Sequence, residues 1–200
     1  MTSRSRDEAG IVVPLRSFTM AKARLADVLS EAERAVLARS MAERVVHAAS
    51  SHAVAIVTSA PEVLDFAREF DCDVLADPGS LDAAAAAGRA WAADRDLARY
   101  AIVHGDLPLA RSFDAILTDV GAAVAVLVPD HRDDGTPAIS LPTSASFAFA
   151  YGPGSAARHA EEARRAGLTV RLVHDDDLGF DVDLADDLAA LESRRRAQVR

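Results

Sequence analysis

Short, continuously apolar runs alternate along the chain with longer segments in which apolar side chains recur at helical spacing. The runs are rich in β-branched residues and predict six strands, at residues 11–15, 53–58, 73–76, 100–104, 124–128 and 169–173. Strands that are apolar on both faces are typical of a sheet covered on both sides. The pattern therefore predicts a mostly parallel sheet.

Helices are predicted between these strands, and the first has the clearest signals. Ser30 and Glu33 have the spacing of a capping box, and Leu37, Met41 and Val45 then recur every four residues. Further helices are predicted at residues 61–70, 81–95, 112–119, 155–166 and 186–194. The alternation of strands and helices predicts an α/β fold with a central sheet flanked by helices.

One segment, residues 129–154, interrupts this alternation. It holds four of the eight prolines and three of the ten glycines, and it has no amphipathic pattern. Irregular connections of this length are often functional. We therefore expect part of a site here.

Length and composition indicate one domain, covering residues 11–193, with flexible tails at 1–10 and 194–200. Half of the 200 residues are hydrophobic, which suffices for one core. The single cysteine, Cys72, favours a reducing compartment, and no apolar stretch is long enough for a secretion signal or a membrane span. We expect a cytoplasmic protein that does not bind membranes.

The net charge of −9 argues against a nucleic-acid-binding surface, because such surfaces need clustered Lys and Arg. An anionic ligand must instead be bound by a local group of cations. The loop after the first predicted strand supplies one, with Arg16, Lys22 and Arg24. In an open parallel sheet, ligands bind beyond the carboxyl ends of the strands, so this loop is a candidate phosphate site. The alternative is a solvated basic loop.

Aspartates in two further segments are candidate Mg²⁺ ligands. Asp106 directly follows an apolar strand, although a turn or cap aspartate would suit that position equally. Asp181 and Asp183 are two residues apart, so on an extended backbone they share a face. Asp186 and Asp187 suit the first turn of the last helix, where the helix dipole favours negative charge.

The segment YGPGS is a candidate anion site in the irregular region. Gly152 and Gly154 permit close approach of a ligand to the backbone, and Ser155 begins an amphipathic helix whose free N–H groups could bind an anion. The alternative is a tight turn with a serine cap. Upstream, Thr136 offers a hydroxyl group.

Together these motifs resemble those of a known enzyme family, and the combination is far more specific than any single motif. PLRSFTMAKARL, HGDLPLA, DDGTPA, YGPGS and DVDLADDL occur in the order and spacing of the guanylyltransferases that act on 2-phospho-L-lactate or phosphoenolpyruvate in coenzyme F(420) biosynthesis. The resemblance covers about residues 11–191. It implies a GT-A-like nucleotidyltransferase fold, with GTP and a small phosphorylated acid as the substrates.

The resemblance also implies residue roles. The GTP phosphates are bound by Arg16, Lys22 and Arg24, of which Lys22 and Arg24 act in catalysis together with Asp106. Mg²⁺ is held by Asp106 with Asp183 or Asp181, and the acid by Thr136, Gly152 and Ser155. Two positions depart from the family pattern: Asp82, a further candidate nucleotide contact, replaces the Asn of a GLNAAL-like segment, and Pro137 replaces the Asn of a DGTN-like segment.

The expected reaction moves GMP from GTP to the phosphorylated acid and releases pyrophosphate. Other functions remain open: a divergent paralogue with another nucleotide or acceptor, a nucleotide-binding protein without turnover, a sugar-nucleotide glycosyltransferase using Asp181-Val182-Asp183, or a dinucleotide-binding enzyme using residues 152–157. A homodimer is possible, because Phe147, Phe149 and Tyr151 could form a dimer contact as well as core.

Overall fold

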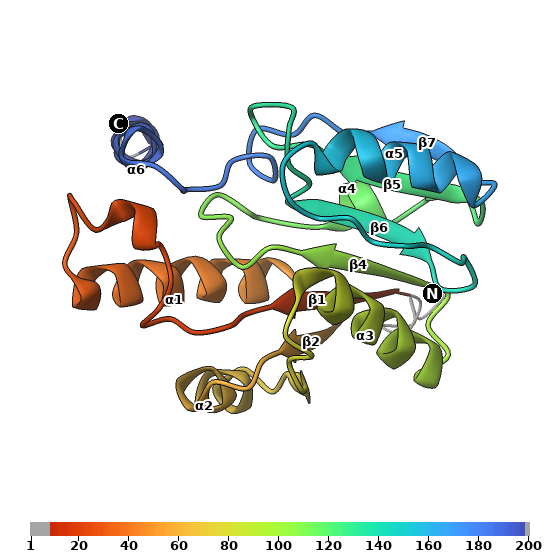
Figure 1. The fold of residues 1–200 in the computed structure, drawn as a ribbon, viewed down its shortest axis with the longest axis horizontal. Helices are drawn as coiled ribbons and strands as arrows, with labels where there is room; N and C mark the ends of the chain where they lie inside the picture. Colours follow the sequence, from red (N-terminus) through yellow and green to blue (C-terminus); the bar gives the residue numbers. More distant parts are fainter. Residues whose placement is uncertain (1–8, 199–200) are drawn as a thin grey trace, which may run out of the picture.

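The computed structural model describes residues 9–198, which form a single seven-stranded sheet with helices on both faces (Figure 1). The strands are β1 (Ala9–Pro14), β2 (Ala53–Val57), β3 (Asp73–Leu75), β4 (Arg99–Val103), β5 (Val124–Val128), β6 (Ala138–Pro142) and β7 (Thr169–Leu172). The helices are η1 (Ala23–Leu25), α1 (Glu31–Ala48), α2 (Pro61–Glu69), α3 (Leu81–Asp94), α4 (Asp114–Leu117), α5 (Ser155–Arg165) and α6 (Ala185–Gln198).

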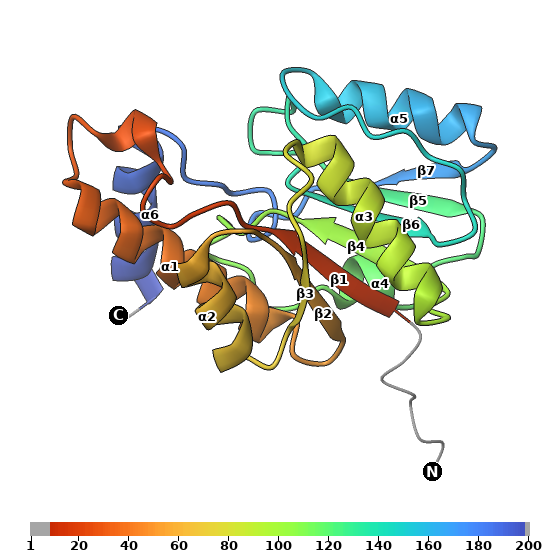
Figure 2. The same ribbon diagram turned by 60° about the horizontal axis from the view of Figure 1, so that its bottom comes forward.

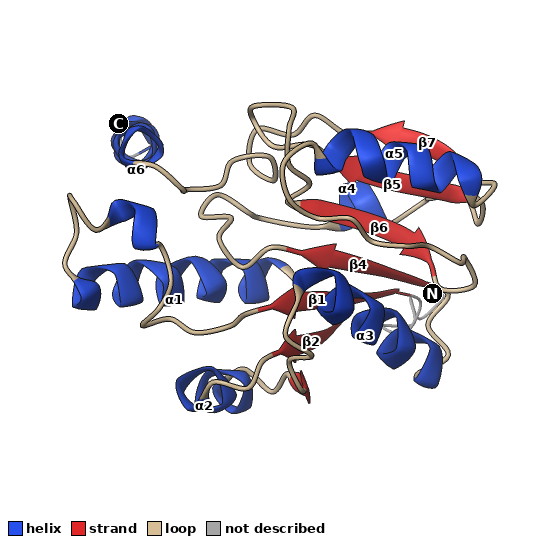
Figure 3. Cartoon of the chain, in the orientation of Figure 1, coloured by secondary structure: helices blue, strands red, loops and turns tan. Residues whose placement is uncertain are grey.

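The sheet is mostly parallel, as predicted. Its strand order is β3-β2-β1-β4-β6-β5-β7, and only the two pairings of β6 are antiparallel (Figure 3). Strands β1 and β4 are neighbours in register from Ala9↔Arg99 to Val12↔Ile102. The segments that leave these two strands therefore emerge side by side at the carboxyl edge of the sheet.

Helices cover the two faces in separate groups (Figure 2). Helices α3 and α5 pack on one face, where Trp91 and Ala163 meet sheet residues such as Val12 and Ile139. Helices α1, α2 and α4 pack on the other face in two apolar clusters, one with Val45 and the other with Val46 and Phe66. Alternate side chains of each central strand thus enter different cores, which explains why these strands are apolar at every position.

The last helix, α6, lies beyond the carboxyl edge of the sheet, beside η1 and α1 (Figure 1). Leu191 on α6 joins Leu25, Met41, Phe180 and Val182 in a separate apolar cluster. This packing brings residues 181–183 back toward the loop that follows β1. Helix α6 continues to Gln198, within the segment predicted to be a flexible tail.

Three larger differences from the prediction remain, and the other boundaries agree to within about one residue. Strand β1 begins at Ala9 rather than residue 11, and the rest of the predicted amino-terminal tail, with residues 199–200, lies outside the described residues. Helix α4 is four residues long instead of the eight predicted. Strand β6 was not predicted, because Pro137 precedes it and Pro142 ends it within the irregular segment, yet all five of its residues are buried between β4 and β5.

Among residues 9–198, no helix combines the length and apolarity that crossing a membrane requires. The predicted capping box is confirmed, since the Ser30 side chain accepts from the Glu33 N–H and the Glu33 side chain accepts from the Ser30 N–H. Phe147, Phe149 and Tyr151 pack against the core beside α5, so the structure uses them as core side chains.

Candidate active site

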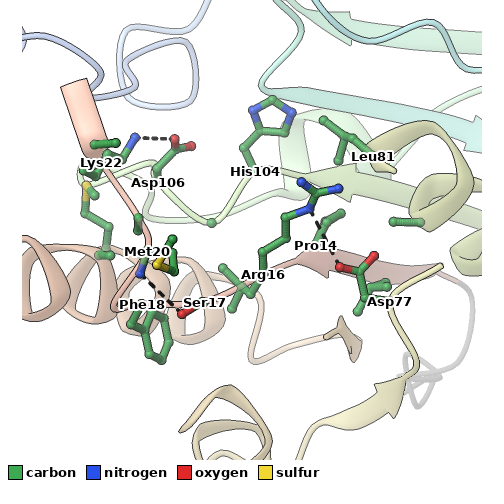
Figure 4. A pocket seen from close by; sticks show the side chains of 18 of the residues that line it. Pro14, Arg16, Ser17, Phe18, Met20, Lys22, Asp77, Leu81, His104 and Asp106 are labelled. Atoms are coloured by element: carbon green, nitrogen blue, oxygen red, sulfur yellow. Dashed lines mark hydrogen bonds and ion pairs between the residues drawn. The ribbon is translucent and has the colours of Figure 1, made fainter. Parts of the chain in front are cut away.

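A cavity of about 810 Å³ opens at the carboxyl edge of β1 and β4 (Figure 4). The end of β1 and the loop after it contribute residues 14–18 and 20–24, and His104 to Asp106 follow β4. One side is formed by Asp77, Gly79, Ser80, Leu81 and Ala84. Asp183 reaches it from the segment before α6. Ligands of open α/β sheets bind at this edge, so the cavity is the candidate active site.

Lys22 connects the two acidic motifs at one end of the cavity. Its Nζ lies 2.6 Å from Asp106 Oδ2 and 3.0 Å from Asp183 Oδ1, although 161 residues separate Lys22 from Asp183. The Lys22 backbone has a φ of 55°, which is uncommon for a residue with a side chain. Such conformations cluster at functional sites, and here it directs the ammonium group toward the two carboxylates.

At this end of the cavity, the charged forms of Lys22 and of the carboxylates stabilise one another. Burial acts to lower the pKa of Lys22, but the charges of Asp106 and Asp183 outweigh it and the pKa is raised. Burial acts to raise the pKa of Asp106, but Lys22 and His104 oppose it and the pKa is lowered. Lys22 is therefore protonated and Asp106 ionised at neutral pH.

The charges of Lys22, Asp106 and Asp183 also affect the pKa of Asp181. Its pKa is raised by burial and by repulsion from Asp106 and Asp183, with Lys22 opposing. Its partners are weak, since His131 Nδ1 and Arg132 Nη1 lie 3.4 and 3.9 Å from Oδ1. Asp183 lines the cavity and contacts Lys22, whereas Asp181 lies outside the lining and faces His131 and Arg132. The structure therefore does not bring both carboxylates of the extended segment into the cavity.

The donor set fits a hard divalent cation such as Mg²⁺. Considering residues 9–198, Asp106 Oδ1 and Asp181 Oδ1 are both buried without a hydrogen-bond partner, which is costly for carboxylate oxygens unless a ligand completes them. In the described part of the chain no three side chains already stand in metal-binding geometry. Lys22 Nζ instead bridges Asp106 and Asp183, at 2.6 and 3.0 Å.

Asp186 and Asp187 have the structural roles predicted for them. Asp187 Oδ2 accepts the N–H groups of Asp183 and Leu184, at 3.0 and 2.8 Å, and Oδ1 pairs with Arg132 at 2.6 Å. Asp186 is exposed in the first turn of α6. Asp187 therefore positions the Asp183 backbone without entering the cavity.

The two predicted arginines differ from Lys22 in position. Arg24 is largely exposed and lies 3.6 Å from Asp183 Oδ2, at the acidic end. Arg16 lies at the opposite end beside Asp77 and Leu81, and its Nη2 donates to the Gly79 carbonyl oxygen (Figure 4). The cations predicted to bind phosphate together are thus divided between the two ends of the cavity.

The three residues predicted to bind the acid come together beside the cavity, outside its lining. Thr136 Oγ1 lies 3.2 Å from Ser155 Oγ, and both side chains are almost fully buried. Gly152 has a φ of 106°, and its carbonyl accepts the Ser155 N–H at 3.0 Å. The N-cap of α5 is Gly154, so Ser155 is the first helical residue and the serine-cap alternative is wrong.

His159 completes this cluster and was not predicted to have any role. Its Nδ1 lies 3.1 Å from Thr136 Oγ1, and its Nε2 accepts the Ala150 N–H at 3.0 Å. The second contact fixes the tautomer, because an acceptor Nε2 leaves the proton on Nδ1. The available signal was its position four residues after Ser155, on the same face of α5. His159 is thus a positioning residue.

Asp82, predicted to contact the nucleotide, instead faces the aromatic segment. Its Oδ1 accepts the Tyr151 N–H at 2.8 Å, and its side chain lies outside the cavity lining. Pro137 lies directly before β6, and its carbonyl accepts the His104 N–H at 2.8 Å. Both departures from the family pattern therefore lie between the cavity and the cluster of Thr136, Ser155 and His159.

Acidification should destabilise the fold through His159. Burial lowers its pKa from 6.5 to about 4, so between these values the unfolded chain binds a proton that the folded chain does not. The contribution of His159 to the free energy of unfolding is therefore fully present above its unfolded pKa and is lost as the pH falls. This loss amounts to about 2 kcal/mol between pH 7.5 and pH 5. Urea unfolding at the two pH values measures the loss, and His159→Gln should remove this part of it.

The exposed His47 on α1 supplies the matched control, His47→Gln, which should keep the wild-type pH dependence. Equal losses of stability in wild type and His159→Gln would contradict the assignment of a neutral buried His159.

Comparison with known proteins agrees with this geometry. The family model described as "Guanylyl transferase CofC like" matches residues 9–192. The chain belongs to this family. Among CofC-like relatives, a phosphoenolpyruvate guanylyltransferase of Rubrobacter xylanophilus is 36% identical, over 94% of this chain and 96% of the relative. The family resemblance expected from the motifs is thereby confirmed.

Other CofC-like relatives carry different substrate names. A 3-phospho-D-glycerate guanylyltransferase of Phenylobacterium zucineum is 31% identical, over 96% of this chain and 94% of the relative. A 2-phospho-L-lactate guanylyltransferase of Methanothermobacter thermautotrophicus is 30% identical, over 90% and 82%. Guanylyl transfer is the common element of these names, whereas the acceptor varies.

A solved structure confirms the nucleotidyltransferase-type fold. It is a proposed nucleotide-diphospho-sugar transferase of Desulfovibrio desulfuricans G20, with a TM-score of 0.77 and 20% identity, over 92% of this chain and 86% of that one. The dinucleotide-binding alternative is wrong in its topology, because residues 152–157 follow an irregular segment late in the chain instead of the first strand.

Proposed function

We propose that this chain transfers GMP from GTP to a small phosphorylated acid, with phosphoenolpyruvate as the first candidate and 2-phospho-L-lactate as the second, in coenzyme F(420) biosynthesis. The observation that carries the proposal is the convergence of Lys22, Asp106 and Asp183 at one end of a cavity large enough for a nucleotide. The CofC-like family supports it.

Mg²⁺ is the cofactor in this proposal, held by Asp106, Asp181 and Asp183. Their oxygens are the ligands that Mg²⁺ prefers, and two of them, Asp106 Oδ1 and Asp181 Oδ1, have no hydrogen-bond partner among the described residues. When bound there, the metal supplies positive charge to the phosphate oxygens. Lys22 would then exchange its carboxylate contacts for phosphate contacts, and Arg24 lies near enough to assist.

The chemistry is an in-line displacement at the α-phosphorus of GTP. A phosphate oxygen of the acid forms the new P–O bond, the bond to the β-phosphate bridging oxygen breaks, and pyrophosphate leaves with that electron pair. The attacking oxygen is already anionic, so no general base is needed. The protein's contribution is positioning and charge neutralisation.

The acid is proposed to bind at Thr136, Gly152 and Ser155. The support for this site is the pair of hydroxyl groups of Thr136 and Ser155, 3.2 Å apart, because hydroxyl groups can donate hydrogen bonds to a carboxylate or phosphate. His159 and Asp82 hold this region through the N–H groups of Ala150 and Tyr151. The three acids named for the relatives differ by small groups, which contacts at this cluster would distinguish.

Pyrophosphate release tests the proposal. Purified protein with Mg²⁺ is assayed with each of the four NTPs and each of phosphoenolpyruvate, 2-phospho-L-lactate and 3-phosphoglycerate. Release that requires GTP and one acid is the expected result and names the acceptor. Release with another nucleotide would indicate a divergent paralogue, and nucleotide binding without release would indicate lost turnover. Hydrolysis of UDP-sugars would favour the glycosyltransferase alternative.

Two further properties belong to the proposal. A cytoplasmic location is supported by the single cysteine, since Cys72 is half-buried and has no second cysteine in the chain with which to form a disulfide. A homodimer stays a prediction, which sedimentation of the purified protein would measure.

A further inference from the structure

The end of the cavity opposite Lys22 has the chemistry of a nucleobase site. Pro14 and Leu81 provide apolar surface there, and Asp77 supplies its carboxylate (Figure 4). Leu15, Val57 and Ala84 are further apolar residues of the cavity lining. With phosphates at the Lys22 and Asp106 end, the base of a bound nucleotide must lie toward Asp77. Apolar walls with a few fixed polar groups are typical of such sites.

Asp77 is held rigidly by the turn that contains it. Its N–H donates to the Thr58 carbonyl at 3.3 Å, and its Oδ1 accepts the Gly79 N–H at 2.8 Å. Its Oδ2 has a looser contact, 3.8 Å from Arg16 Nε. The side chain is 18% exposed, so the carboxylate is oriented by the backbone and still reachable from the cavity.

We propose that Asp77 selects guanine by accepting hydrogen bonds from its N1–H and its exocyclic amino group. This inference rests on the guanylyl transfer proposed above. An ionised carboxylate only accepts hydrogen bonds, and guanine alone among the four bases presents two adjacent donors on its pairing edge. Adenine and cytosine present a ring acceptor there, and uracil presents carbonyl oxygens beside its single donor, so each would be repelled.

Arg16 complements this arrangement. Its guanidinium contacts both Asp77 and the Gly79 carbonyl, so it borders the same subsite from the β1 side. A cation there can donate to the O6 of guanine, which lies beside N1–H. The pair therefore matches the donor and acceptor order of guanine.

Asp77→Asn tests the proposal with GTP, ITP, XTP and ATP as substrates. Xanthine carries a carbonyl oxygen where guanine carries its amino group, so the amide should accept XTP and reject GTP. We expect the wild-type ratio of kcat/KM for GTP over XTP to fall by about 10³-fold or more in Asp77→Asn, because unpaired polar groups in a site cost heavily. ITP, which lacks the amino group, should be intermediate in wild type.

Asp65→Asn on the exposed surface of α2 is the matched control and should keep the wild-type ratio. An unchanged preference for GTP over XTP in Asp77→Asn would overturn the assignment of Asp77. Calorimetric binding of the same nucleotides separates this from a failure of the proposed function. If wild type binds GTP without transfer, the binding preference still decides the role of Asp77; if it binds none of the four, both proposals fall.

Discussion

Asp106→Asn should lower the turnover number of guanylyl transfer by about 10³-fold while the protein stays folded. The amide keeps the size of the carboxylate but removes the charge that attracts a divalent cation. Lys22 retains Asp183 as a partner, and the repulsion that acts on Asp181 is relieved, so the fold should tolerate the change. Pyrophosphate release measures the activity, and thermal unfolding monitored by circular dichroism measures the fold.

Asp186→Asn is the matched control, because Asp186 is an exposed aspartate in the first turn of α6. Its activity should equal that of wild type. Calorimetric titration with Mg²⁺ adds a readout independent of turnover, and Asp106→Asn should bind the ion more weakly. Near-normal turnover in Asp106→Asn would show that the metal site has been assigned to the wrong carboxylates.

Lys22→Met should lower the rate by about 10²-fold or more, since it removes a charge placed at the phosphate end. It should also change the response to Mg²⁺. Without the ammonium group, Asp106, Asp181 and Asp183 repel one another with no buried counter-charge, so the metal-free protein should unfold at a lower temperature than wild type. Added Mg²⁺ should then raise its Tm more than that of wild type.

Arg68→Met on the exposed surface of α2 controls for loss of a cation and should leave both measurements unchanged. Lys22→Arg keeps the charge and should preserve the metal-free Tm better than Lys22→Met does. Lys22 is also the only lysine of the sequence, so selective ¹⁵N-lysine labelling gives a single lysine amide signal. A signal that does not move on addition of Mg²⁺ and GTP would contradict an exchange of partners by Lys22.

Much of the fold could be predicted from local patterns. Predicted and observed strands agree closely at β2, β4 and β5, because buried strands of a parallel sheet are apolar throughout. The predicted start of α1 is also correct, since its capping box acts within four residues. Strand β6 was missed because its pairing partners, β4 and β5, both lie earlier in the chain and no local pattern marks the register.

The sequence indicated candidate residues of the site, but it did not indicate which of them lie together. Lys22, Asp106 and Asp183 were each found beside a strand or helix boundary, but only the structure shows the 2.6 and 3.0 Å contacts that join them. Arg16 was grouped with Lys22 because they share a loop, yet the fold sends it toward Asp77. Asp82 was assigned to the nucleotide from the family resemblance, whereas its carboxylate accepts the Tyr151 N–H.

The sequence by itself determined the alternating α/β architecture, the carboxyl edge of the sheet as the location of a site, and the chemical types of the groups there. These follow from hydrophobic periodicity and local capping, which act over a few residues. Only the tertiary structure decided which distant groups meet. The packing of Leu191 against Leu25 and Met41 places α6 beside the β1 loop, and the antiparallel insertion of β6 places Pro137 beside His104. Such contacts depend on chain closure over long separations, which local sequence patterns do not encode.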